Sequence, residues 1–232
     1  MTGKLYLIPS FMGEDNLAII PAHITDAVMG LNEFVVENLR TARRYLRAIG
    51  YTKNFDTEVI LHELNKHEQT NAPAMLANLL KGKSIGIISE AGNPCIADPG
   101  YELVHYAHSK NISVVPLVGA SSILLALIAS GMNGQQFTFS GYLPIPSGER
   151  VKKLKQIEDT ARRFGVTQLF METPFRNMSL LRDMLSTLDA ETRLCIACDL
   201  TLPTEYIATK KVEDWRKEQT NFHKRYCIYV IG

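Results

Sequence analysis

The stretch SIGIISEAGNPCIADPG, residues 84–100, decides the fold. It begins with a continuous apolar run, which is typical of a buried strand, and ends in small polar residues and turn formers. In open α/β sheets, ligands bind in the loops that follow the carboxyl ends of the strands. Gly92 lies in the middle of this loop, where the lack of a side chain lets backbone groups come close to a ligand. The stretch therefore predicts an α/β sheet with a ligand-binding loop.

The rest of the chain alternates short β-branched runs with longer helical patterns. The predicted strands are residues 4–9, 33–37, 57–63, 84–90, 113–118, 137–143, 167–172, 193–200, 205–211 and 225–232. The predicted helices are residues 40–50, 72–82, 101–111, 121–131, 149–165 and 177–189. Because parallel strands need a crossover, this order predicts a mainly parallel first sheet, and the crowded C-terminal strands predict a mixed second sheet. We expect two tightly joined α/β domains, residues 1–116 and 117–232.

Composition and charge exclude several classes of protein. With 46% hydrophobic and 21% charged residues, the 232-residue chain is typical of a globular protein rather than a disordered one. Its formal net charge of +1 gives no chain-wide basic signal for nucleic acid. The first apolar run is too short for a signal peptide or a membrane span, so we expect a cytoplasmic protein with no membrane partner. The four cysteines are too few and too scattered for a disulfide framework, so they are expected to be reduced.

Several familiar motifs are absent or incomplete. The sequence has no G-x-G-x-x-G after the first strand, no G-x-x-x-x-G-K-[ST] and no G-x-S-x-G, which argues against the common nucleotide cradles and a serine hydrolase. His62 and His67 would lie about 140° apart on a helix and cannot share one metal ion. Cys195 and Cys198 are expected on opposite faces of a strand, which indicates burial rather than a zinc site. We expect no metal.

A second ligand loop is predicted in VVPLVGASSILLALIAS, residues 114–130. Gly119, Ser121 and Ser122 lead into a helix there, and the free N–H groups of a helix N-terminus can hold an anion such as a carboxylate. Either loop alone is also consistent with a turn and a helix cap. Two such loops after neighbouring strands favour a shared site for a small molecule.

Several segments, taken in order, carry a family likeness. SEAGNPCIADPGYELV resembles the S-D-A-G-T-P-x-I-S-D-P-G-Y-x-L-V segment of the tetrapyrrole-methylase-like class of S-adenosylmethionine-dependent methyltransferases. The segments LHELNKH, VVPLVGASSILLALIASGM, FTFSGYLPIPSGER and LFMETPFR are similar to further segments of that class. More narrowly, the sequence is similar to the branch that methylates a cytidine 2′-oxygen of 16S ribosomal RNA. The resemblance runs nearly end to end.

The resemblance implies a methyltransferase with two α/β domains and a cofactor cleft between them, usually a homodimer. Carried over position by position, the residues expected to bind S-adenosylmethionine are Met12, Ser89, Glu90, Gly92, Asn93, Ile96, Ser121, Ser122, Met171 and Leu200. Carbonyl oxygens and an acidic residue suit a sulfonium cation, and apolar side chains suit the adenine. A hydroxyl acceptor also needs a base, and the candidate catalytic residues are Glu37, Arg40, His62 and Asn65.

Some residues of the ribosomal RNA branch are replaced in this chain. VENLR stands where that branch has A-E-D-T-R, so Glu37 and Arg40 are kept while Asn38 and Leu39 replace Asp and Thr. PSFMGEDN likewise stands where the branch has P-T-P-I-G-N-L-x-D, and Glu90 replaces an Asp. Methyl transfer to ribosomal RNA is the predicted function. Two alternatives stay open, which are methylation of a tetrapyrrole or precorrin-like small molecule and a cofactor-binding protein that has lost turnover.

A run of arginines is relevant to which molecule accepts the methyl group. Arg40, Arg44 and Arg47 lie four and three residues apart in NLRTARRYLR, so on a helix they share one face and can follow RNA phosphates. Arginines on a solvated helix are more often plain surface residues. The run is therefore compatible with a partner such as ribosomal RNA or the small ribosomal subunit.

Overall fold

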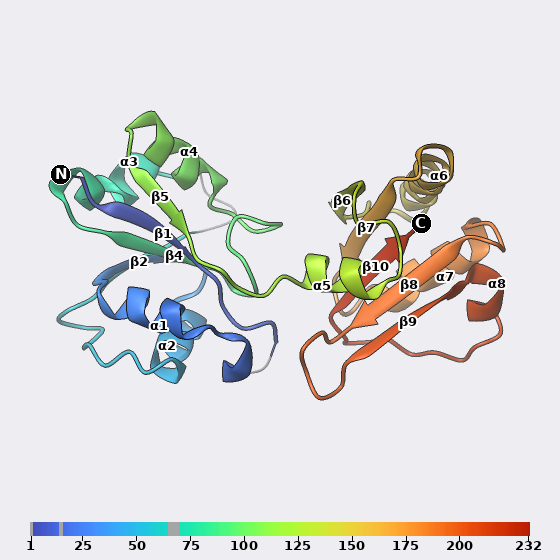
Figure 1. The fold of residues 1–232 in the computed structure, drawn as a ribbon, viewed down its shortest axis with the longest axis horizontal. Coiled ribbons are helices and arrows are strands. Elements are labelled where there is room, and N and C mark those ends of the chain that lie inside the picture. Colours follow the sequence, from blue (N-terminus) through green and yellow to red (C-terminus); the bar gives the residue numbers. More distant parts are fainter. Residues whose placement is uncertain (1, 14–15, 65–69) are drawn as a thin grey trace. The chain divides into compact units, whose positions relative to one another are not determined.

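The computed structural model describes residues 2–13, 16–64 and 70–232, and the chain divides into two units, Met1–Ser121 and Ser122–Gly232 (Figure 1). The strands of unit 1 are β1 (Lys4–Ile8), β2 (Glu33–Val36), β3 (Ile60–Glu63), β4 (Ile85–Ile88) and β5 (Ser113–Pro116). Its helices are α1 (Ala22–Met29), α2 (Leu39–Ala48), α3 (Ala72–Met75) and α4 (Tyr101–Ser109), with short 3-10 helices η1 (Leu17–Ile19) and η2 (Ala77–Lys81).

Unit 2 is built from a second set of strands and helices. Its strands are β6 (Phe137–Tyr142), β7 (Thr167–Glu172), β8 (Arg193–Cys198), β9 (Tyr206–Lys211) and β10 (Cys227–Ile231). Its helices are α5 (Ser122–Ala129), α6 (Ser147–Phe164), α7 (Asn177–Thr187) and α8 (Val212–Trp215).

The strands of unit 1 form a wholly parallel sheet in the order β3-β2-β4-β1-β5. All four residues of the central strand β4 are buried, as its apolar sequence predicts. Ile8 of β1 and Val36 of β2 both pair with Ile88 of β4, so these three strands end at the same level. The loops that follow them therefore start side by side at the carboxyl edge of the sheet.

Helices cover both faces of this sheet, as right-handed crossovers require. Through α1 and α2 the chain moves along the sheet from β1 to β2 and on to β3, and through α3 and α4 it moves back to β4 and on to β5. The two pairs of helices therefore cover opposite faces (Figure 1). The consecutive residues Phe34 and Val35 accordingly belong to two different apolar cores. Gly86 of β4 allows close packing in the core that contains Phe34 and Ile8, because a Cβ on Gly86 would lie 2.5 Å from Ile8 Cδ1.

Unit 2 has a mixed sheet in the order β6-β7-β10-β8-β9. β6 and β7 are parallel, whereas β10 runs antiparallel to β7 and β8, and β9 runs antiparallel to β8. One face carries a core with Phe170, Met184 and Trp215, and the other carries a core to which α5 contributes Ala126 and Leu127. The prediction of an α/β fold with a parallel first sheet and a mixed second sheet is confirmed.

Each predicted strand is present, and the differences lie in the helices. The helix predicted over residues 72–82 is split into α3 and η2. The sequence analysis missed α1, whose segment AHITDAVM has β-branched and polar residues and no side-chain cap, although its inward residues Ile24 and Val28 keep a helical spacing of four. Within the described residues, no helix is both long and apolar enough to cross a membrane.

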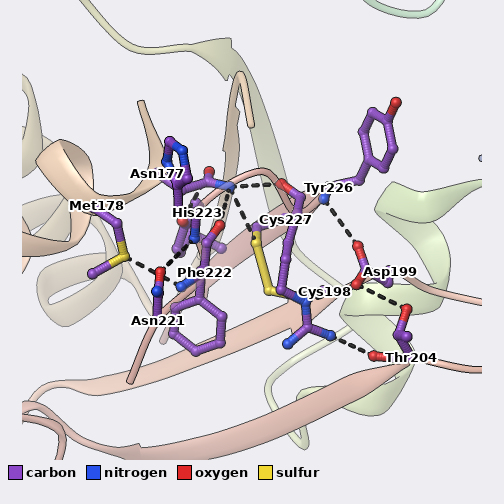
Figure 2. Close-up of a disulfide and its surroundings, with 12 residues drawn as sticks. Asn177, Met178, Cys198, Asp199, Thr204, Asn221, Phe222, His223, Tyr226 and Cys227 are labelled. Atoms are coloured by element: carbon purple, nitrogen blue, oxygen red, sulfur yellow. Dashed lines mark hydrogen bonds and ion pairs between the residues drawn. A yellow bond between two sulfur atoms is a disulfide. The ribbon is translucent and has the colours of Figure 1, made fainter. Parts of the chain in front are cut away.

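The expectation of four reduced cysteines is wrong for Cys198 and Cys227, which form a disulfide (Figure 2). These residues lie directly opposite each other on the antiparallel strands β8 and β10, with Cα atoms 4.2 Å apart. Their separation of 29 residues in the sequence hides this pairing. Cys195 and Cys198 contribute to opposite faces of the sheet, as their odd spacing predicts.

Candidate functional site

Three loops are tied together at the carboxyl edge of the unit 1 sheet. The Ser10 N–H donates to the Gly92 carbonyl at 2.9 Å, and the Gly92 N–H donates to the Phe11 carbonyl at 3.2 Å. These two bonds join the loop after β1 to the loop after β4. The Leu117 N–H donates to the Leu7 carbonyl at 3.0 Å, which continues the β1–β5 pairing into the third loop. The backbone at this edge is thus held by hydrogen bonds from several directions.

Two buried serines reinforce the joint between the first two loops. The Ser89 hydroxyl donates to the Gly92 carbonyl at 2.5 Å, and Ser10 Oγ lies 3.4 Å from Ser89 Oγ. Because a hydroxyl has one proton, Ser10 is the donor in the second contact. Both serines are buried, so the bonds are shielded from competing water. Ser89, predicted as a cofactor residue, fixes the shape of the loop.

Two glycines bring the loops into close contact. Gly92 has a φ of +68°, and a Cβ there would lie 3.3 Å from the Ala120 carbonyl oxygen and 3.9 Å from Met12 Sδ. A Cβ on Gly119 would lie 2.2 Å from Pro9 Cβ and 3.3 Å from Asn93 Oδ1. The structure therefore brings together the predicted cofactor residues Met12, Gly92 and Asn93 and the loop that ends at Ser121.

A pocket opens where these loops meet α2. Its volume is about 380 Å³, including space open to solvent. It is lined by Ser10, Phe11, Gly13, Thr41, Ala42, Arg44, Tyr45, Ile88, Ser89 and Glu90. The Glu90 carboxylate accepts a hydrogen bond of 2.5 Å from the Thr41 hydroxyl, so it faces α2. The pocket combines one carboxylate, one guanidinium and several hydroxyls, a set that suits a polar ligand.

Two aromatic residues hold α2 against the loop after β1. The rings of Phe11 and Tyr45 pack edge to face with centroids 5.1 Å apart. The Tyr45 hydroxyl donates to the Pro9 carbonyl at 2.7 Å. Burial raises the pKa of Tyr45 well above its usual value, so the hydroxyl keeps its proton and remains a donor. This contact fixes the distance between the two walls of the pocket.

The second half of the loop, residues 94–100, has an unusual backbone. Cys95 and Ala97 have positive φ values of 67° and 59°, and Gly100 has a φ of 121°. Burial, and secondarily the charge of Asp98, raises the pKa of the Cys95 thiol to about 11. Cys95 is therefore a protonated thiol at neutral pH and a poor nucleophile. Ile96 is 46% exposed, which leaves its side chain accessible for the apolar contact that was predicted.

Two of the four candidate catalytic residues lie beside the pocket wall formed by α2. Glu37 directly follows β2 at the carboxyl edge of the sheet. Arg40 is exposed in the first turn of α2. That turn is capped by Asn38, whose side chain accepts from the N–H groups of Arg40 and Thr41 at 2.9 and 3.1 Å. The Asn that replaces the family Asp therefore works as a helix cap.

Of the other two candidates, His62 is held by a carboxylate away from the pocket lining. His62 Nε2 lies 2.7 Å from Glu33 Oε1, and Glu33 also accepts from Asn78 Nδ2 at 2.8 Å. Glu33 is the first residue of β2, and His62 on β3 pairs with Val35 of the same strand. His62 is not among the residues that line the pocket. Asn65 lies outside the described residues.

Two of the three predicted cofactor residues of unit 2, Met171 and Leu200, share one apolar cluster. Met171 on β7 and Leu200 after β8 belong to one apolar cluster, to which α5 also contributes. Ser122 is the first residue of α5. Leu200 is 6% exposed and Met171 is partly buried, so both already have apolar neighbours within unit 2.

The turn that carries Leu200 is held by Asp199. Its carboxylate accepts from the Tyr226 N–H at 3.0 Å (Figure 2). It also accepts from Arg225 Nε at 2.7 Å. The Thr204 hydroxyl donates to the same carboxylate at 3.1 Å. Asp199 has a φ of 50°, a conformation that Asp tolerates better than most residues. These bonds fix the turn at Asp199, which lies between the disulfide-bonded Cys198 and Leu200.

A comparison with known families matches residues 25–215 to the Tetrapyrrole (Corrin/Porphyrin) Methylases. This chain belongs to that family. Among its relatives is the ribosomal RNA small subunit methyltransferase I of Vibrio cholerae, 34% identical over 98% of this chain and 76% of the relative. The protein of the same name from Escherichia coli O157:H7 is 32% identical over 99% of this chain and 77% of the relative. The chain is a methyltransferase.

Solved structures agree on the fold of this tetrapyrrole methylase. The methyltransferase CobJ superposes with a TM-score of 0.65 at 15% identity and covers all of this chain and 94% of its own. The cobalt precorrin-4 methyltransferase CbiF superposes with a TM-score of 0.60 at 14% identity, covering 99% of this chain and 94% of its own. At such low identity the likeness shows a shared fold only.

Several residues that line the pocket of this methylase were not predicted from the sequence, among them Ser10, Thr41 and Tyr45. Ser10 follows a predicted strand and could have been found by the same rule that pointed to Ser89. Thr41 and Tyr45 have no such signal, because they lie within a helix whose local pattern indicates only an apolar and a basic face. Thr41 meets Glu90 across 49 residues of sequence.

Proposed function

We propose that this tetrapyrrole methylase is an S-adenosylmethionine-dependent methyltransferase that methylates a ribose 2′-oxygen of small-subunit ribosomal RNA. The observation that carries the proposal is the likeness, over nearly the whole chain, to relatives named ribosomal RNA small subunit methyltransferase I. The hydrogen-bonded loops at the carboxyl edge of the unit 1 sheet support a small-molecule site there, because that edge is where open α/β sheets bind ligands.

The unit 1 loops fit S-adenosylmethionine in their chemistry. Gly92 is buried, and its lack of a side chain lets the loops after β1, β4 and β5 close on one another, because a Cβ there would crowd the Ala120 carbonyl and Met12. Carbonyl oxygens, hydroxyls and the Glu90 carboxylate suit a sulfonium cation better than a basic cradle would. We assign cofactor binding to Met12, Ser89, Glu90, Gly92, Asn93, Ile96 and Ser121 in unit 1, and to Ser122, Met171 and Leu200 in unit 2.

Bound S-adenosylmethionine would supply an electrophilic methyl group, and the protein would supply position and proton removal. The bonds from Ser10, Ser89 and Gly92 hold the loops before any ligand arrives. Correct alignment of the reacting groups is worth up to about 7 to 11 kcal/mol of the barrier in ideal cases. Glu37 is our choice of base for the ribose hydroxyl, because it follows β2 at the carboxyl edge whereas His62 is held by Glu33.

We further propose a cytoplasmic homodimer with no membrane partner. The support is the family likeness, together with the proposed acceptor, since small-subunit ribosomal RNA lies in the cytoplasm. Sedimentation equilibrium is expected to give twice the chain mass of 26.0 kDa. A single 26.0 kDa species at micromolar concentration would contradict the dimer without affecting the proposed reaction.

Calorimetry and a transfer assay test the proposal together. The protein is titrated with S-adenosylmethionine and S-adenosylhomocysteine, then given the radiolabelled cofactor with RNA or with small-molecule extract from a strain that lacks the protein. We expect binding of both ligands and label in the small-subunit RNA. Glu37→Gln is expected to keep cofactor affinity and to lose most of the transfer.

The same assay separates the alternatives. Label in a tetrapyrrole fraction rather than in RNA would favour a small-molecule methylase. Binding without transfer to either fraction would favour a protein that has lost turnover. If neither ligand binds, the cofactor assignment is wrong.

A further inference from the structure

The outward face of α2 is a basic surface, which we define by Arg40, Arg43, Arg44 and Arg47. All four are exposed, whereas the inward residues of the same helix are buried. At 100° per residue the four side chains fall within an arc of about 100°, and they span about 10 Å along the helix axis. The surface is therefore a narrow stripe of positive charge rather than a scatter of arginines.

Neighbouring groups hold two of these arginines in place. Arg47 donates from Nη1 to the Tyr51 carbonyl at 2.5 Å and from Nη2 to the Lys53 carbonyl at 3.0 Å. Its guanidinium also lies 4.3 Å from the centre of the Phe55 ring, and that of Arg43 lies 5.5 Å from the same ring. A guanidinium has five donors, so two bonds orient it without exhausting it. Ordering these side chains in advance lowers the entropy lost on binding an anion.

The acidic partner of Arg43 in this surface is itself exposed to solvent. Arg43 pairs with Asp56 at 3.6 Å, but both side chains are largely exposed, at 46% and 82%. Exposed pairs of this kind contribute only about 0 to 1 kcal/mol, so a phosphate can displace the carboxylate at little cost. Lys53 adds a further positive charge beside the helix, where its ammonium donates to Asn32 Oδ1 at 2.9 Å.

The basic surface leads into the pocket of unit 1. Thr41 and Arg44 of α2 line that pocket together with Glu90, while Arg43 and Arg47 continue the stripe along the helix. A chain with regularly spaced negative charges can follow the stripe and place one of its units at the pocket. RNA has this property, because every nucleotide carries a phosphate.

We propose that the outward face of α2 binds the sugar–phosphate backbone of the acceptor RNA and guides it to the unit 1 pocket, an inference that rests on the proposed function. Guanidinium groups bind phosphate through paired hydrogen bonds. The contact is with the backbone, so it positions the RNA without reading its sequence. An acidic protein segment is the competing occupant of such a surface.

The test uses the variant Arg43→Gln/Arg47→Gln, because neither residue lines the pocket. Its probe is small-subunit ribosomal RNA transcribed in vitro, with affinity measured from 0.05 to 0.3 M salt. The log–log salt slope is about −0.7 per phosphate contact for single strands, so losing two contacts lowers its magnitude by about 1.4 and weakens binding about 25-fold at 0.1 M salt. Arg43→Lys/Arg47→Lys keeps the charge and is expected to keep most of the slope.

The matched control is Arg162→Gln/Arg163→Gln, which removes two exposed arginines from α6 in unit 2. It is expected to bind the RNA within about twofold of the parent protein. The inference is overturned if the α2 variant keeps the parent slope, if the α6 variant loses as much, or if poly-L-glutamate of equal charge competes as well as RNA. Calorimetry with S-adenosylmethionine and methyl transfer by the parent protein are measured first, so failure of the proposed function is seen separately.

Discussion

Gly119→Ala tests whether the contact between the loops after β1 and β5 positions the site. A Cβ at this residue would lie 2.2 Å from Pro9 Cβ and 2.3 Å from Pro9 Cγ. Ordinary van der Waals contact begins near 3.4 Å, so the two loops must separate by at least about 1.2 Å. A proline ring is fixed to the backbone and cannot rotate away. The strain therefore falls on the loops that hold Met12 and Asn93.

The expected cost divides between stability and function. Overpacking of this kind costs about 1 to 3 kcal/mol of folding stability, which lowers the melting temperature without unfolding the protein at 25 °C. A misplacement of about 1 Å at a site can reduce turnover by about 100-fold. We expect at least a tenfold loss of affinity for S-adenosylhomocysteine by calorimetry and about a 100-fold loss of methyl transfer.

Gly134→Ala is the matched control, because a Cβ on Gly134 would meet nothing within 4 Å. It is expected to leave both cofactor affinity and transfer unchanged. Circular dichroism of each variant at the assay temperature confirms that the fold is intact. The reasoning is refuted if Gly119→Ala is folded and binds S-adenosylhomocysteine within twofold of the parent protein.

Three further perturbations test other parts of the account. Glu90→Ala removes the carboxylate bonded to Thr41 and should weaken cofactor binding in calorimetry, and unchanged affinity would show that Glu90 serves α2 alone. Reducing the Cys198–Cys227 disulfide frees the loop that it closes in the unfolded chain, which should lower the free energy of unfolding by about 3.5 kcal/mol in the chain-entropy description. Reductant should therefore lower the melting temperature of the parent protein but not that of Cys227→Ala. The Cys95 pKa of about 11 leaves about 0.1% thiolate at pH 8. In a Cys195→Ala protein, Cys95 should therefore react with iodoacetamide about 200-fold more slowly than a free cysteine, and the rate should rise as the pH approaches 11. A pH-independent rate would contradict the raised pKa.

The strands and their layers could be predicted because the signal is local. The buried run 85–88 and the alternation around it show the parallel sheet of unit 1 without any knowledge of distant contacts. The helix α1 was missed because its segment mixes β-branched and polar residues, and packing of Ile24 and Val28 on the sheet stabilises it instead of intrinsic propensity.

The site residues in the loops after the strands could be predicted from the sequence, whereas their contact partners from other parts of the chain could not. Gly92 and Ser89 follow a strand and could be found by that rule. The partners that give them their roles come from elsewhere in the chain: Thr41 meets Glu90, and Pro9 meets Gly119. The disulfide was missed for the same reason, since the pairing of β8 with β10 depends on the topology of the whole sheet. No local pattern contains such contacts.

The central claim is methyl transfer to a ribose oxygen of small-subunit ribosomal RNA. The direct measurement incubates unmethylated small-subunit RNA with the protein and radiolabelled S-adenosylmethionine, then hydrolyses the RNA in alkali. A methylated 2′-oxygen cannot attack the adjacent phosphate, so the account predicts that the label is recovered in an alkali-resistant dinucleotide. Label in mononucleotides would place the methyl group on a base, and no label in RNA from a preparation that binds the cofactor would contradict the claim.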